Sequence, residues 1–236
     1  MPPSSKASVD AGRGKADAEP AVVGPLGLPN GVFDDIVEKR APAWSEVVET
    51  PCQVSPKLSA MTGCDLYLKL ENFQYTGAFK ERGALAKLLS LDEAARSRGV
   101  IAASAGNHAQ GVARHAALLG IDATIVMPEH TPFVKVEQTR ALGARVVLTG
   151  ADYDDAAKAA QGLCTEEGRT FVHPFDDPYV CAGQGTVAAE MLQAVPSLDT
   201  LVVPIGGGGL ISGMATVAKR LNPNTRIIGV QAALFP

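Results

Sequence analysis

The sequence predicts a doubly wound α/β fold with two lobes. Short apolar runs of strand length alternate with longer helical patterns along most of the chain, which indicates parallel strands joined by right-handed crossover helices. The 236 residues are 46% hydrophobic and 19% charged, so a sizeable core can form. We therefore expect one large α/β domain or two smaller ones.

The elements are expected in a regular order. Residues 1–30 are rich in Pro, Ser, Ala and Gly without a hydrophobic period, and they are interpreted as a disordered extension. The apolar spacing from Val32 to Val48 predicts a helix that ends at Thr50 and Pro51. The predicted strands cover residues 66–70, 100–103, 123–127, 145–148, 201–204 and 226–230. The predicted helices lie near residues 107–119, 132–142, 153–167, 183–194 and 210–221.

The two lobes are expected to be built from three segments. Residues 84–147 would form the smaller lobe, and residues 31–83 and 148–236 the larger one. In open parallel sheets, ligands bind at the carboxyl ends of the strands, where the strand-to-helix loops gather. Two of the three motifs described below lie in such loops, so we expect a binding site between the lobes.

Charge and composition exclude several classes of function. The formal net charge is −4 and Lys and Arg are scattered, so nucleic acid is not an expected partner. No apolar stretch reaches transmembrane length, and the N-terminus lacks the charged start and apolar block of a secretory signal. The cysteines show no Cys-x-x-Cys spacing and are expected to be reduced thiols of a cytoplasmic protein. The histidines form no cluster with metal-ligand spacing, so no metal site is expected.

Lys80 is the candidate reactive residue. It follows the small residues Thr76, Gly77 and Ala78 and the aromatic Phe79, where the chain leaves a strand and begins a helix. Most lysines lie on a solvated face. A partly desolvated amine near the positive end of a helix dipole, however, has a lowered pKa and can form a Schiff base with a carbonyl compound.

Four consecutive glycines, Gly206, Gly207, Gly208 and Gly209, form the second motif. They follow a predicted strand and precede a predicted helix. Backbone N–H groups without side chains can approach an anion, and the helix dipole adds attraction, so a phosphate is the expected ligand. A flexible turn explains the same residues. The motif is neither a Walker loop nor a dinucleotide fingerprint, because the residues that complete those patterns are absent.

The third motif, Ser104-Ala105-Gly106-Asn107-His108, also follows a strand and opens a helix. Ser104 or Asn107 could simply cap this helix, and taken alone the motif favours that interpretation. Alternatively, the hydroxyl, the backbone amides and the Asn107 amide could face the cleft and bind a carboxylate. For His108, a structural hydrogen bond is favoured over catalysis.

Together, the three motifs resemble the fold type II pyridoxal phosphate enzymes, whose fold is tryptophan synthase β-like. More narrowly, the chain looks like the threonine dehydratase (threonine ammonia-lyase) and serine racemase group. The resemblance extends from about Asp34 to Val230. It also includes the segments Thr50-Pro51, Leu68-Lys69-Leu70-Glu71-Asn72, Val172-His173-Pro174-Phe175 and Ala182-Gly183-Gln184-Gly185-Thr186.

The resemblance implies a role for each motif. Lys80 would form the Schiff base with pyridoxal 5'-phosphate, Phe79 would pack against the cofactor ring, and Asn107 would contact its phenolic oxygen. Residues 206–209 would hold the phosphate. The loop that receives the substrate carboxylate would consist of Ser104, Ala105, Gly106, Asn107 and His108.

The chemistry implied by the resemblance is β-elimination from an amino acid. Neutral Lys80 would abstract the α-proton as general base while the cofactor acts as electron sink. The β-hydroxyl would leave as water, with the cofactor phosphate as proton donor. L-threonine would give 2-oxobutanoate and ammonia, as in isoleucine biosynthesis, and L-serine would give pyruvate.

Two residues argue for a dehydratase over a serine racemase. The racemase has a serine before the loop glycine, which can reprotonate the opposite face of the carbanion, whereas Ala105 has no proton to give. Racemases also bring a carboxylate to a metal site just after the last matched strand. The corresponding residue here is Gln231, a weaker ligand for a hard cation.

The family continues beyond the segment matched here, with further strands and a polar residue at the pyridine nitrogen. The larger lobe is therefore expected to be incomplete at Pro236. The alternative to a lyase is a truncated, inactive homologue that binds cofactor or a partner without turnover. A nucleotide-binding module would leave Lys80 unexplained. A homo-oligomer that acts on a small amino acid is expected from the resemblance.

Overall fold

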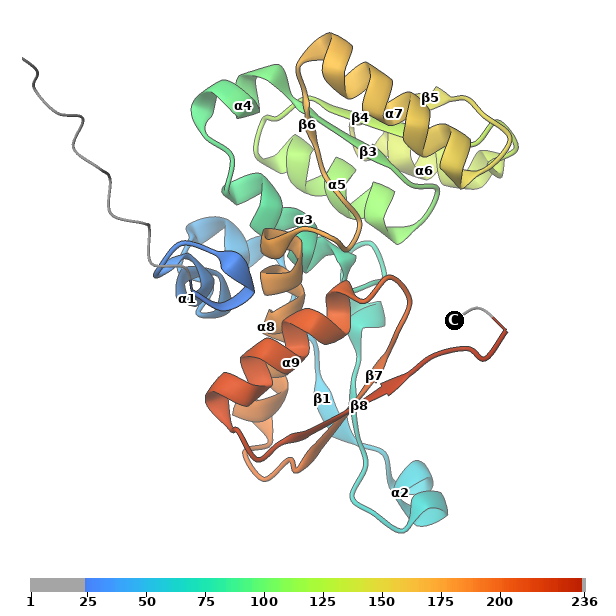
Figure 1. Cartoon of the computed structure of the whole chain (residues 1–236). Helices are drawn as coiled ribbons and strands as arrows, with labels where there is room; N and C mark the ends of the chain where they lie inside the picture. The colour runs from blue at the N-terminus through green and yellow to red at the C-terminus, as the bar shows by residue number, and fades with distance from the viewer. Residues whose placement is uncertain (1–23, 235–236) are drawn as a thin grey trace, which may run out of the picture.

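Two parallel sheets lie on either side of a central group of helices (Figure 1). The computed structural model describes residues 24–234. The larger sheet has the strand order β5-β4-β3-β6, the smaller one pairs β7 with β8, and every neighbouring pair in both sheets is parallel. The predicted α/β class is therefore confirmed. Within the described range, no helix is long and apolar enough to cross a lipid bilayer.

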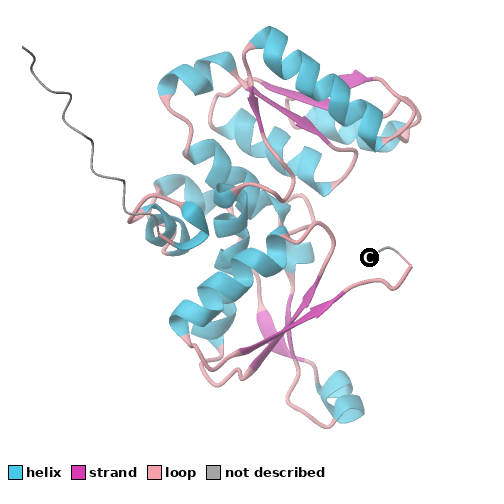
Figure 2. Cartoon of the chain, viewed as in Figure 1, coloured by secondary structure: helices cyan, strands magenta, loops and turns pink. Residues whose placement is uncertain are grey.

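The four-stranded sheet is covered by helices on both faces (Figure 2). Its strands are β3 (Val100–Ala103), β4 (Ala123–Met127), β5 (Arg145–Leu148) and β6 (Thr170–Phe171). The associated helices are α4 (Glu93–Arg98), α5 (Asn107–Leu118), α6 (Phe133–Ala141) and α7 (Tyr153–Glu167). Alternate residues of β3 belong to separate apolar clusters, one with α5 and one with α7. Burial on both faces explains why this strand is apolar throughout.

In the second half of the molecule, the helices pack closely against one another at glycine residues. It contains α3 (Lys80–Leu89), α8 (Pro178–Ala194), α9 (Gly209–Leu221), β7 (Thr200–Pro204) and β8 (Arg226–Val230). A Cβ atom at Gly183 of α8 would collide with the Arg82 carbonyl oxygen of α3, and one at Gly213 of α9 would collide with the Cys181 carbonyl oxygen of α8. These contacts, here called the glycine seam, bring three helix backbones into direct contact.

The N-terminal part differs from its prediction in two ways. The expected helix from Val32 to Val48 is wrong: α1 (Val32–Val37) ends early, because Lys39 has a left-handed φ of 53°, and a 3₁₀ helix, η2 (Pro42–Glu46), follows. Part of the expected extension is also ordered. Residues 24–30 contain the 3₁₀ helix η1 (Pro25–Gly27), and Leu28 is buried in the core, whereas residues 1–23 lie outside the described residues.

The remaining predicted elements are confirmed, with one shifted boundary. Helix α8 begins at Pro178 rather than residue 183, because the Asp177 carboxylate caps it by accepting from the amides of Tyr179 and Val180. The alternation of strands and helices did not reveal an antiparallel pair. The pair consists of β1 (Cys52–Val54) and β2 (Tyr67–Lys69). Helix α2 (Pro56–Thr62) lies between these strands in the sequence, and the 3₁₀ helix η3 (Glu71–Phe73) follows them.

Residue 147, where the smaller lobe is expected to end, lies within β5 of the four-stranded sheet. The four-stranded sheet also takes in β5, which ends at Leu148, and β6, and α7 packs on β3 and β4 of the same sheet. We therefore propose that the smaller lobe continues to Phe171. Helix α3 packs on both α5 and α8, so it joins the two parts.

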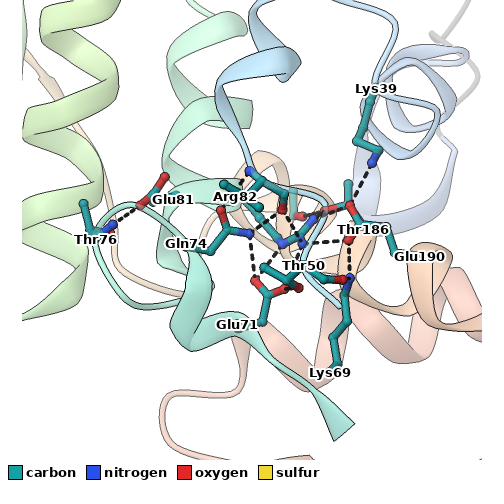
Figure 3. Close-up of polar contacts among 12 residues, drawn as sticks. Lys39, Thr50, Lys69, Glu71, Gln74, Thr76, Glu81, Arg82, Thr186 and Glu190 are labelled. Carbon is teal, nitrogen blue, oxygen red and sulfur yellow. Dashed lines mark hydrogen bonds and ion pairs between the residues drawn. The ribbon is translucent and has the colours of Figure 1, made fainter. Parts of the chain in front are cut away.

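Arg82, two residues after Lys80, is the centre of a buried ionic network (Figure 3). Its guanidinium donates to both carboxylate oxygens of Glu71 at 2.8 Å and to both of Glu190 at 2.7 and 2.8 Å. Lys39 and Lys69 also donate to Glu190. The network joins η3, α3 and α8, which are far apart in the sequence.

The network lowers the pKa of the Glu190 carboxylate. Burial alone would raise it, but hydrogen bonds and charge from Arg82, with further bonds from Lys39 and Lys69, lower the pKa from 4.5 to about 2. Between about pH 2 and pH 4.5, the Glu190 carboxylate binds more protons in the unfolded chain than in the folded one. The stability that Glu190 contributes is therefore complete above about pH 4.5 and is lost as the pH falls towards 2.

The substitution Glu190→Ala tests the network. At pH 7 we expect it to lower the free energy of unfolding by about 3–5 kcal/mol, because three buried or half-buried cations lose a partner. Urea unfolding of both proteins as a function of pH measures the difference, which should shrink below pH 4.5.

Arg40→Ala is the matched control. Arg40 also pairs with two carboxylates, Glu38 and Asp35, but its side chain is 55% exposed, so we expect no measurable change in stability. Equal effects of the two substitutions would contradict a stabilising role for the buried network.

Candidate active site

Lys80 is the first residue of α3, and its amine points towards the segment that follows β6. The Lys80 Nζ donates a hydrogen bond to the Pro174 carbonyl oxygen at 2.7 Å and lies 5.4 Å from the centroid of the Phe79 ring. Burial lowers the pKa of the Lys80 amine, while the nearby Cys181 thiol partly opposes this shift. A larger share of the amine is therefore neutral and nucleophilic than for an exposed lysine.

The tetraglycine loop connects β7 to the start of α9. The amides of Gly206, Gly207 and Gly208 have no acceptor among the residues that the structure describes. Gly208 has a left-handed φ of 87°, and a Cβ atom at Gly206 or Gly208 would meet no other atom within 4 Å. Unpaired amides with open space beside them at a helix N-terminus form a suitable site for an anion such as phosphate.

The loop of residues 104–108 connects β3 to α5, and the structure contradicts the interpretation that it caps the helix. The N-cap position is Gly106, and no side chain caps α5. The Ser104 hydroxyl instead accepts a hydrogen bond from the Gly106 amide at 3.2 Å. Ala105 packs partly buried against the core, whereas Asn107 is exposed and makes no side-chain hydrogen bond to any described residue. The helix N-terminus is thus left open.

His108 has a structural hydrogen bond, as its position in the sequence favoured. Its Nε2 lies 2.9 Å from the Val172 carbonyl oxygen, and the ring is buried. Burial is the main cause of a pKa lowered to about 4, so the imidazole is neutral near pH 7 and donates from Nε2. This bond attaches the start of α5 to the segment after β6.

One segment, residues 172–176, contacts all three motifs. Val172 accepts from His108, Pro174 accepts from Lys80, and the Phe175 ring packs on Gly207. Sequence analysis included this segment in the family resemblance but gave it no role. Sequence analysis had no signal for this role, because β6 is not among the predicted strands. In the folded chain β3 and β6 are parallel neighbours, and the loops after them leave the same edge of the sheet.

The residues present fit pyridoxal phosphate. The half-buried amine of Lys80 suits the aldehyde group, and the unpaired amides beside Gly206 and Gly208 suit the phosphate. Gly106 likewise faces open space, since a Cβ atom there would meet nothing within 4 Å. In residues 24–234, no group of three or more His, Cys, Asp or Glu side chains is placed to hold a metal ion.

Comparison with known proteins identifies enzymes that are similar to this chain in sequence and in structure. The chain is 49% identical over 204 residues to an L-threonine ammonia-lyase of Thermotoga maritima, covering 86% of this chain and 51% of that enzyme. Its structure is similar to the processed form of threonine deaminase isoform 2 from Solanum lycopersicum, with a TM-score of 0.81, 38% identity and coverage of 93% and 65% of the two chains. Maize serine racemase is also similar, with a TM-score of 0.79, 42% identity and coverage of 84% and 60%.

The chain thus spans about half the length of the ammonia-lyase that it matches. A family model described as "pyridoxal-phosphate dependent enzyme" matches residues 44–236, which include the lysine, both loops and the segment that joins them. By this match and by its fold, the chain belongs to the family of pyridoxal-phosphate dependent enzymes.

Proposed function

We propose that this chain forms the active site of a threonine ammonia-lyase, which converts L-threonine to 2-oxobutanoate and ammonia. The observation that carries the proposal is the contact of the Lys80 amine with the same segment that packs on the tetraglycine loop. An amine and an anion site are thereby joined through one short piece of chain. The similarity to the ammonia-lyase and the threonine deaminase supports the choice of substrate.

Bound pyridoxal phosphate would supply the electron sink for a carbanion at the substrate's α-carbon. The unpaired amides of residues 206–208 would hold its phosphate, and Lys80, whose amine lies beside the Phe79 ring, would bind its aldehyde group. The open N-terminus of α5 and the amides of residues 104–108 attract the substrate carboxylate. Neutral Lys80 Nζ accepts the α-proton, and burial favours this neutral state.

Elimination, rather than inversion of the α-carbon, is favoured by Ala105. A racemase needs a second proton donor on the face opposite the base, and the Ala105 methyl group has no proton to give. The reaction is redox-neutral: the substrate loses its β-hydroxyl as water, a water is taken up when the imine hydrolyses, and ammonia leaves. L-serine would give pyruvate by the same steps.

A second candidate function is cofactor binding without turnover. The β7–β8 sheet exposes Val202, Ile228 and Val230, with 63%, 37% and 53% of their surfaces accessible. Apolar side chains on one exposed sheet face favour association with further protein. In this case the cofactor would bind to Lys80, and turnover would require the additional surface.

Borohydride reduction tests the amine site. After incubation with pyridoxal phosphate, reduction should attach the cofactor to Lys80, and peptide mapping by mass spectrometry should locate it there rather than on exposed Lys57. Lys80→Ala should abolish this product and leave background labelling at Lys57 unchanged. Equal labelling of many surface lysines in the unaltered protein would contradict the assignment.

The pH dependence of labelling gives an independent test of the amine. Burial lowers the pKa of Lys80. Its amine therefore becomes neutral at a lower pH than the amine of an ordinary solvated lysine. Labelling of Lys80 should therefore persist at pH values where a small solvated amine, such as free n-butylamine, no longer reacts with pyridoxal phosphate. Identical pH profiles for Lys80 and this reference amine would contradict a desolvated amine.

Product formation separates the two candidate functions. We expect the chain, loaded with cofactor, to form 2-oxobutanoate from L-threonine, and Lys80→Ala to remove this activity. A coupled assay for 2-oxo acids measures both. Specific labelling at Lys80 without product would favour the second candidate.

A further inference from the structure

A turn between Lys80 and the tetraglycine loop has no assigned role in the chemistry above. It comprises residues 173–176, His-Pro-Phe-Asp, directly after β6 and Val172 and just before Asp177, the cap of α8. The 173–176 turn contacts the amine on one side and the glycines on the other. Its geometry therefore bears on how the two halves of the site are spaced.

The turn is held in shape by side chains at both ends. The His173 Nδ1 accepts hydrogen bonds from the amides of Phe175 at 3.3 Å and Asp176 at 2.7 Å, and its ring meets the Phe175 ring edge-on at 4.7 Å. The Cys181 thiol of α8 donates to the Phe175 carbonyl oxygen at 3.2 Å. The backbone of the turn is thus anchored to the helix behind it.

Packing of the Phe175 ring explains why one residue of the loop, Gly207, must be glycine, whether or not an anion binds. A Cβ atom at Gly207 would collide with the ring, and one at Gly209 would meet the backbone of Phe175 at 2.8 Å. At Gly206 and Gly208 the same atom would meet nothing within 4 Å. The loop therefore has an open side, suited to the anion, and a closed side that packs on the turn.

We propose that His173 and Phe175 are positioning residues, which fix the tetraglycine loop relative to the Lys80 amine. Phe175 packs against the loop, and the neighbouring Pro174 carbonyl accepts a hydrogen bond from Lys80 Nζ. His173 holds the backbone of both residues in place, because its Nδ1 accepts from the amides that follow them. A single four-residue turn thereby sets the distance between the groups that bind the two ends of the cofactor. This inference rests on the proposed function of Lys80 and the loop.

A double-mutant cycle between Gly207 and Phe175 tests the packing without any cofactor. Gly207→Ala should lower the melting temperature of the cofactor-free protein or prevent folding, because the added methyl group collides with the ring. In the Phe175→Ala background the same substitution should have little effect. Gly206→Ala is the control and should leave the melting temperature unchanged, since its methyl group enters open space. Equal losses from Gly207→Ala in both backgrounds would overturn the proposal.

Cofactor loading measures the consequence for the site. Gly207→Ala should weaken labelling of Lys80 by pyridoxal phosphate about tenfold. In the Phe175→Ala background, the same substitution should weaken this labelling much less. If the unaltered chain is not labelled at Lys80, the proposed function fails, whereas the melting-temperature cycle still decides whether Phe175 positions the loop. The two failures are therefore distinguishable.

Conservative replacement tests His173. The Oδ1 of an asparagine can accept from amides two and three residues later, as His173 Nδ1 does, so His173→Asn should retain labelling of Lys80. His173→Ala lacks an acceptor and should weaken the apparent affinity for pyridoxal phosphate about tenfold. Equal affinities of the two variants would contradict the role of His173.

Discussion

Burial of the Arg82 guanidinium is the constraint on which the packing of η3, α3 and α8 depends. A guanidinium cannot lose its charge, so it can be buried only where carboxylates surround it. Glu71 and Glu190 do so from two different elements, which fixes α3 against α8. Lys80 lies about half a helical turn earlier, so the same ion pairs that stabilise the fold also fix the backbone from which the Lys80 side chain extends.

The adjacent residue, Glu81, ties α3 to the other part of the molecule. Its carboxylate accepts from the Thr76 amide and contacts His115 of α5 at 3.4 Å, as Figure 3 shows in part. Burial opposes ionisation, but the contacts with His115 and Thr76 lower the pKa of Glu81. Charges of opposite sign at consecutive positions thus hold the backbone next to Lys80 from two sides.

Sequence patterns predicted the periodic parts of this chain and the residues with unusual local chemistry. The apolar runs of β3 and β4, the glycines and Lys80 each have a signature within a few residues. The contacts of Arg82 with Glu190 and of Phe175 with Gly207 have none, because the partners come from distant elements and only the folded chain brings them together. The end of α1 was missed because Lys39 adopts a backbone conformation that non-glycine residues rarely take.

The glycine seam has a consequence for how such a chain can diverge. At Gly183 and Gly213 a carbonyl oxygen of the next helix occupies the space where any side chain would begin. No rotamer can relieve that overlap, so the helices would have to separate together, and Arg82, whose own carbonyl lies against Gly183, would move with them. Homologous sequences can therefore differ in loops and on outer helix faces. Replacement of a glycine in the glycine seam would require several simultaneous substitutions in the neighbouring helices.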